Sequence, residues 1–155
     1  AELRIGILLW PGFPLLSLAG LCDGLRHAAD LGDQSRQNRC SWAILGKAGE
    51  SVTASCGVKV PVDLPLSAPL DYDYIAVIGG LLPQIASVDP AQVAFLREVA
   101  RSQIPLIGIC TGSFVLAAPT RAVLRKLTTE PAHTAVWTHG HVDHAAATAA
   151  LARRA

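Results

Sequence analysis

The chain has 155 residues, of which 51% are apolar and 16% are charged, and its formal net charge is +1. This length and composition indicate one globular domain with its own core and exclude a disordered chain. The low net charge argues against a broad surface for nucleic acid or anionic membrane. No apolar run approaches the roughly 20 residues of a membrane span.

The amino-terminal residues lead directly into an apolar stretch and lack a secretory signal pattern. The cysteines are scattered along the chain and form no C-x-x-C pair: Cys22, Cys40, Cys56 and Cys110. In a chain of this size, such spacing predicts reduced thiols and a cytoplasmic protein.

The first elements are read from apolar periodicity. Residues 3–10 form an apolar run typical of a buried strand, and the Pro-Gly-Phe-Pro sequence at 11–14 predicts a turn. Ser17 precedes an i, i+3, i+4, i+7 apolar stripe that reaches Ala29. This pattern predicts an amphipathic helix with Ser17 as its N-cap. The next expected elements are a loop at residues 32–39, a strand at 40–45, a small hairpin of 51–55 and 58–62 around Gly57, and a surface loop containing Pro61, Pro65 and Pro69.

A third core strand is expected at residues 74–78. Asp89 and Pro90 then open a helix, with proline at the first helical position and Gln92 in the place of a capping-box residue. The alternation of strands and helices predicts a three-layer α/β/α sandwich with a mostly parallel, flavodoxin-like sheet.

The most informative stretch is an apolar run that ends in Gly108-Ile-Cys110-Thr-Gly112 and continues into a helix. Two glycines that flank a central residue at this spacing are typical of a nucleophile elbow, in which the central side chain sits on a strained turn at the carboxyl edge of the sheet. The amino end of the following helix would favour the thiolate of Cys110. The alternative is a small buried cysteine that only packs.

Three segments together resemble a known family. The sequences of residues 5–13, 77–80 and 108–117 are similar to the ThiJ/PfpI superfamily, which has the class I glutamine-amidotransferase-like fold. Within it, the likeness is closest to the amino-terminal, amidase-like domain of AraC-family transcriptional regulators, and it covers residues 3 to about 118. In that family a helix-turn-helix domain follows, so DNA would be bound only through a domain that this sequence lacks. The resemblance implies a ligand-sensing domain that forms a homodimer.

The resemblance also implies site residues. Cys110 matches the nucleophile, and Gly79 and Gly80 match the loop that offers backbone N–H groups as an oxyanion hole. The acid partner of catalytic relatives falls at Ser17, which cannot act as a carboxylate. The chain is therefore expected to bind a small ligand through Ser17, Cys110, Thr111 and Gly112 without efficient turnover.

An alternative is a Cys-dependent hydrolase or hydratase of the same superfamily. Cys110 would attack the substrate, and His133 or His139 would act as the base. No cofactor is required by either interpretation.

Residues 119–155 are expected to complete the domain of residues 1–118 with a helix, a strand at 133–138 and a final helix. They carry an H-x-H-x-D-H pattern that resembles the metal-binding motif of the metallo-β-lactamase fold: His139, His141, Asp143 and His144. In that fold such residues bind zinc. The alternatives are a polar turn that Asp143 caps, and a fragment, fusion or altered reading frame.

Overall fold

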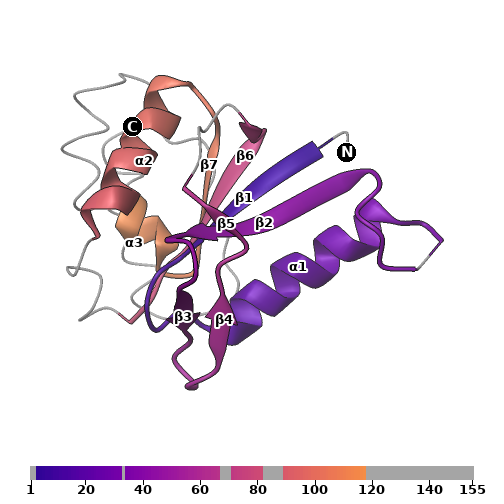
Figure 1. Ribbon diagram of the computed structural model, residues 1–155, viewed down its shortest axis with the longest axis horizontal. Helices are drawn as coiled ribbons and strands as arrows, with labels where there is room; N and C mark the ends of the chain where they lie inside the picture. Colours follow the sequence, from indigo (N-terminus) through magenta and orange to yellow (C-terminus); the bar gives the residue numbers. More distant parts are fainter. Residues whose placement is uncertain (1–2, 33, 67–70, 82–88, 118–155) are drawn as a thin grey trace, which may run out of the picture.

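The computed structural model describes residues 3–32, 34–66, 71–81 and 89–117, and the structural statements below concern these residues. The chain begins with a strand and a helix, continues through five consecutive strands, and ends with a helix, a strand and a helix (Figure 1). They are β1 (Leu3–Leu9), α1 (Leu15–Ala29), β2 (Cys40–Gly46), β3 (Ser51–Thr53), β4 (Lys59–Pro61), β5 (Leu64–Pro65), β6 (Tyr74–Ile78), α2 (Pro90–Arg101), β7 (Leu106–Ile109) and α3 (Gly112–Ala117).

The main sheet is parallel and has the strand order β5-β2-β1-β6-β7. From β1 the chain passes to β2 on one side and later to β6 on the other. This is the flavodoxin-like strand order that the sequence predicted. The direction in which successive strands are added to the sheet reverses between β1 and β6. The carboxyl ends of β1, β6 and β7 therefore meet at one edge of the sheet, next to this switch point.

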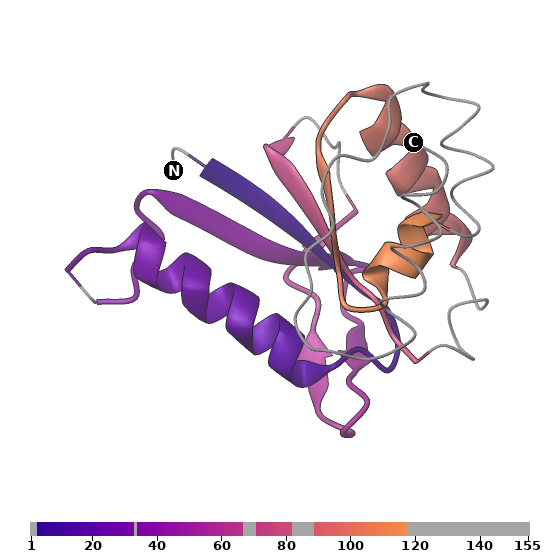
Figure 2. The same cartoon turned by 180° about the vertical axis from the view of Figure 1, so that it is seen from behind.

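Helices cover both faces of the sheet, which confirms the predicted three layers. α1 lies on one face, and α2 and α3 lie on the other (Figures 1 and 2). The core is correspondingly divided into two clusters. Leu18 of α1 belongs to the cluster on the first face, and Leu96 of α2 and Val115 of α3 belong to the cluster on the second face. Near-continuous apolar strands are what a parallel sheet covered on both faces requires.

The predicted small hairpin is confirmed as the antiparallel pair β3 and β4, which lies beside the start of α1 (Figure 1). Its turn includes Gly57, whose φ is +88°. The backbone of this hairpin is tied to the turn after β1, because Gly12 N–H donates to the Thr53 carbonyl and Ser55 N–H donates to the Phe13 carbonyl.

Several expectations about local structure were wrong. α1 begins at Leu15 with Pro14 as its N-cap, so Ser17 lies inside the first turn and does not cap the helix. Residues 64–65 were expected in a loop, yet they form the short edge strand β5, where the proline lies at the strand end and at the edge of the sheet.

The start of α2 follows the prediction in one respect and departs from it in another. The Asp89 side chain caps the helix by accepting a hydrogen bond from Ala91 N–H at 2.9 Å, and Pro90 is the first helical residue. The Gln92 side chain, expected to complete a capping box, instead donates to the Leu9 carbonyl at 3.4 Å. Gln92 therefore connects α2 to the end of β1.

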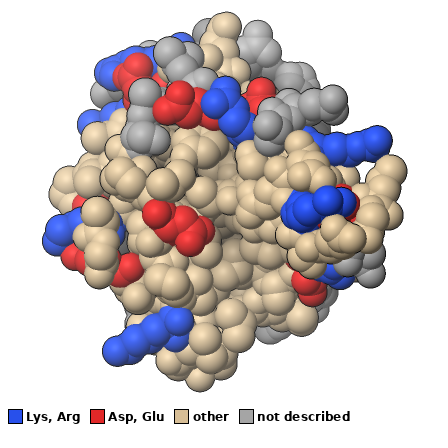
Figure 3. Space-filling view, turned by 45° about the vertical axis from the view of Figure 1, so that its right-hand side comes forward, with Lys and Arg blue, Asp and Glu red and all other residues tan. Residues whose placement is uncertain are grey.

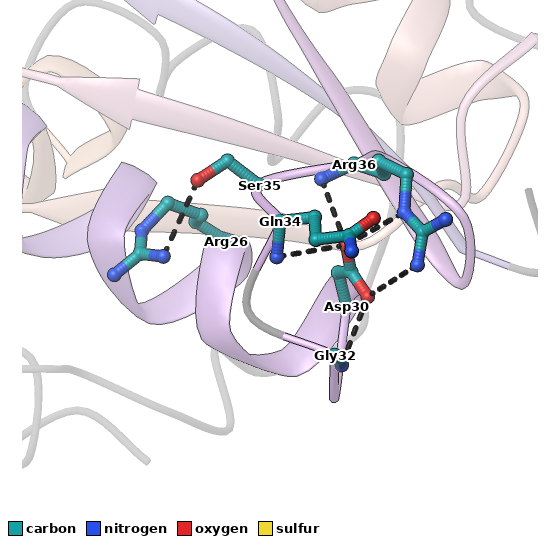
Figure 4. Close-up of polar contacts among 6 residues, drawn as sticks. All are labelled: Arg26, Asp30, Gly32, Gln34, Ser35 and Arg36. Atoms are coloured by element: carbon teal, nitrogen blue, oxygen red, sulfur yellow. Dashed lines mark hydrogen bonds and ion pairs between the residues drawn. The ribbon is translucent and has the colours of Figure 1, made fainter.

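The loop after α1 is organised by one buried carboxylate (Figure 4). Asp30 accepts hydrogen bonds from the backbone N–H groups of Gly32, Gln34 and Arg36 and from the Arg36 side chain. The hydrogen bond from the Arg36 side chain is the main reason why the pKa of Asp30 lies well below its usual range.

No helix in the described part of the chain is long and apolar enough to cross a membrane.

Candidate functional site

Cys110 lies directly after β7 and has a φ of +53°. Residues other than glycine rarely adopt this left-handed region of backbone conformation. It is followed at once by α3. The residue is 6% exposed and belongs to the apolar cluster on the α1 face, together with Phe13 and Leu18. A strained cysteine between a buried strand and a helix has the backbone geometry expected of a nucleophile elbow.

Glycines are needed around Cys110 because three backbone segments meet there. A Cβ at Gly79 would lie 2.1 Å from Gly112 N, and a Cβ at Gly80 would lie 1.9 Å from the Pro11 carbonyl oxygen. These distances are far below van der Waals contact. The end of β6 is therefore in direct contact with the turn after β1 and with the elbow after β7.

The hydroxyl of Thr111 ties the elbow to the loop after β6. Thr111 is 6% exposed, and its Oγ1 donates a hydrogen bond of 2.6 Å to the Gly80 carbonyl. Ser113 Oγ donates to the Cys110 carbonyl at 3.0 Å and so steadies the turn. From the sequence we expected Thr111 to bind a ligand, and we did not predict its hydrogen bond to Gly80. The sequence next to a nucleophile does not indicate which backbone carbonyl a threonine hydroxyl will contact.

The two glycines assigned to the oxyanion hole differ in their backbone roles. Gly79 N–H donates to the Ile109 carbonyl at 3.3 Å, which continues the pairing between β6 and β7. That N–H group is consequently engaged in the sheet. The Gly80 N–H is thus the better candidate for contact with a ligand.

Ser17 lies in the first turn of α1 and is 6% exposed. At this buried position a hydroxyl is neutral and cannot accept and hold a proton as a carboxylate would. Asp23, the acidic residue that follows on the same helix, points to solvent with 76% of its side chain exposed and lies 3.9 Å from Arg26. Asp23 is therefore a solvent-exposed residue of α1.

The other three cysteines, Cys22, Cys40 and Cys56, form no disulfide bond in the part of the chain that the structure describes. Burial is the main reason why the pKa values of the Cys22 and Cys40 thiols are raised, so these groups are poor nucleophiles. Cys56 is exposed in the hairpin region.

The described part of the chain holds no group of three or more His, Cys, Asp or Glu residues arranged for a metal ion. One face has Lys and Arg side chains around its margin, and its middle carries uncharged side chains and an acidic group (Figure 3). Five residues assigned to catalysis or metal binding lie outside the described residues: His133, His139, His141, Asp143 and His144.

The model of the DJ-1/PfpI family matches residues 6–149 of this sequence. The chain belongs to the DJ-1/PfpI family. The match extends past residue 118 and takes in the whole H-x-H-x-D-H pattern at 139–144, so the likeness to the metallo-β-lactamase fold is not supported.

Known proteins with similar sequences include HTH-type transcriptional regulators. The chain is 31% identical over 132 residues to the "Uncharacterized protein in cpoL 5'region" of Streptomyces lividans, covering 85% of this chain and 90% of that protein. It is 36% identical over 113 residues to the HTH-type transcriptional regulator GbdR of Pseudomonas aeruginosa and 34% identical over 110 residues to CdhR of the same species. These matches cover 73% and 71% of this chain, but only 30% and 31% of the two regulators. This DJ-1/PfpI domain is thus homologous to about a third of each regulator.

Solved structures show the same fold. The crystal structure of an AraC family transcriptional regulator from Pseudomonas putida has a TM-score of 0.61 at 20% identity, covering 98% of this chain and 90% of that chain. A ThiJ/PfpI family protein from Pseudomonas syringae has a TM-score of 0.62 at 18% identity, covering 99% and 69%.

Proposed function

We propose that this DJ-1/PfpI domain binds a small organic ligand at the carboxyl edge of its sheet, as the sensing part of an AraC-type transcriptional regulator. Open parallel sheets bind ligands at this edge, next to the switch point. The observation that carries the proposal is the combination of an intact elbow at Cys110 with a buried, neutral Ser17. Such a site keeps the shape for a ligand and lacks a carboxylate for proton transfer.

The ligand would contact Ser17, the Cys110 side chain and the backbone N–H groups of Gly80, Thr111 and Gly112. These are neutral donors and acceptors in a largely apolar surrounding. A small, polar ligand with a carbonyl oxygen fits them best, since a buried N–H group gains most from an oxygen acceptor.

A thermal-shift screen of small amines, amino acids and amides tests this proposal. A ligand at about 100 times its dissociation constant adds about 2.7 kcal/mol to the stability of the domain. The expected rise in Tm is about 5–10 °C for a domain of this size. Cys110→Ser should reduce the response, and Cys56→Ser, the same change at an exposed thiol, should leave it intact. The proposal fails if no compound stabilises this chain while a homologous regulator domain responds in the same screen.

We further infer that the domain acts as a homodimer and that, in the full regulator, DNA is bound by a separate helix-turn-helix domain. The homology of this domain to part of the HTH-type transcriptional regulators GbdR and CdhR supports the separate helix-turn-helix domain. The dimer is an expectation from the family resemblance. Light scattering of the purified domain tests the dimer: a monomer at all concentrations would contradict it.

The left-handed backbone at Cys110 favours one second candidate, a Cys-dependent hydrolase or hydratase. Its base would be His133 or His139. The pH dependence of iodoacetamide labelling distinguishes the two functions. A labelling pKa near the free-thiol value of about 8.5 removes the case for an activated nucleophile.

A further inference from the structure

The side chain of Thr111 forms a buried bridge between two segments that are distant in sequence. Its hydrogen bond of 2.6 Å to the Gly80 carbonyl is short for a neutral O–H donor, and both residues are buried. Without that donor, a buried carbonyl oxygen would lose its partner, which is costly. The bond therefore holds the loop after β6 against the elbow.

This hydrogen bond matters for the backbone at Gly80, because glycine has no side chain that would restrain its two backbone dihedrals. Its surroundings leave little room: the Pro11 carbonyl oxygen occupies the place of a side chain on Gly80. The neighbouring Gly79 is fixed through its N–H bond to the Ile109 carbonyl. Gly80 is thus clamped between the sheet on one side and the Thr111 hydroxyl on the other.

A hydroxyl has one proton to donate, and Thr111 donates it to Gly80. A ligand at Cys110 therefore cannot receive a hydrogen bond from this hydroxyl while the bridge is intact. Contact between Thr111 and a ligand is left to the backbone N–H.

We propose that Thr111 is a positioning residue. Its hydroxyl fixes the peptide after Gly80 and the Gly79 N–H bond fixes the peptide before Gly79, so the Gly79–Gly80 peptide between them is held with its N–H available to the carbonyl oxygen of a neutral, amide-like ligand at Cys110. This rests on the proposed ligand site. It assigns the hydroxyl to the architecture of the site, and it predicts that carbonyl recognition depends on a group that does not touch the ligand.

The test compares two alkylating reagents at Cys110. Iodoacetamide carries a carbonyl that the Gly80 N–H can hold, whereas methyl iodide carries none. Mass spectrometry gives the labelling rate at Cys110 separately from that at Cys56, which is exposed and serves as the internal reference. Thr111→Val removes the hydroxyl at nearly constant shape, Thr111→Ala removes it in a smaller side chain, and Thr111→Ser retains it.

Loss of the Thr111–Gly80 hydrogen bond should lower the ratio of the iodoacetamide rate to the methyl iodide rate at Cys110 by about five-fold in the valine and alanine variants. Thr111→Ser should keep the wild-type ratio, and the ratio at Cys56 should not change in any variant. A merely structural role would lower Tm, or change both rates together, and leave the ratio unaltered.

An unchanged ratio in folded Thr111→Val or Thr111→Ala protein overturns the positioning role. If the thermal-shift screen then still finds a ligand, the proposed function survives. A wild-type Cys110 that neither reagent labels would overturn both, because it would show that the site is closed to small molecules.

Discussion

A Cβ placed on Gly112 would lie 2.0 Å from the carbonyl oxygen of Val77, although the two residues belong to different elements, α3 and β6. No side chain fits there unless the elbow moves away from the sheet. The second glycine of the elbow is therefore required by its contact with β6 as much as by the turn at Cys110.

We predict that Gly112→Ala destabilises the domain by about 3 kcal/mol or more, because both clashing groups are backbone and cannot rotate away. Gly24→Ala is the matched control: Gly24 is exposed on α1, and a Cβ there has no neighbour within 4 Å. That change should stabilise the helix by about 0.5–1 kcal/mol. Urea unfolding measures both, and a Gly112→Ala variant as stable as the wild type would contradict the contact.

The Asp30 network predicts a pH-dependent contribution to stability. The hydrogen bond from the Arg36 side chain is the largest cause of the lowered pKa of Asp30 in the folded protein. A lowered folded-state pKa stabilises the fold above the unfolded-state value of about 3.9, and this stabilisation is lost as the pH falls below it.

Asp30→Asn should therefore lower Tm at pH 7, and the difference from wild type should shrink as the pH falls below about 4. Thermal unfolding followed by circular dichroism across this range measures the effect. Asp23→Asn, at an exposed carboxylate on the same helix, should have little effect at any pH. A Tm difference for Asp30→Asn that stays constant down to pH 3 would contradict the assignment.

The end of α2 offers a stabilising substitution. Gln103 has a φ of +56°, Gln103 N–H donates to the Ala100 carbonyl, and Ile104 N–H donates to the Val99 carbonyl. This is a Schellman motif with a side chain at the position that glycine usually takes. Gln103→Gly should increase the free energy of unfolding by about 0.5–1 kcal/mol, whereas Gln103→Ala, which keeps the Cβ, should leave it nearly unchanged. Equal stability of the two variants would show that the left-handed backbone is not the source of strain.

The sequence predicted the layers and the elbow because their signals are local. An apolar strand followed by two spaced glycines around Cys110 is visible within a few residues, as is the Asp89-Pro90 helix start. The bond from Thr111 to Gly80 is different, since it depends on the register that places Ile78 opposite Ile109. No periodicity within one strand encodes that register.

The misplaced start of α1 has a similar cause. Ser17 is a residue type that favours N-caps, yet the fixed φ of Pro14 sets the start of the helix earlier in the chain. The strand β5 was missed because its two residues include a proline, and only its place at the sheet edge makes that proline acceptable.

The H-x-H-x-D-H sequence makes a separate prediction about metal. The family match gives no support to a metallo-β-lactamase site, so we expect substoichiometric zinc in protein purified without a histidine tag. Elemental analysis of the wild type and of the His139→Ala, His141→Ala double variant measures this. Stoichiometric zinc that disappears in the double variant would contradict the expectation and establish a metal site.

The central claim is that the Cys110 site binds a ligand without consuming it. The most direct test is NMR spectroscopy of a compound from the thermal-shift screen, incubated with a tenth of its concentration of protein. With the wild type we predict ligand signals that broaden or shift on binding and keep their full intensity over a day. With Cys110→Ser the broadening or shift should be smaller. Progressive conversion of the compound beyond one equivalent of protein, abolished by Cys110→Ser, would contradict the account and establish an enzyme.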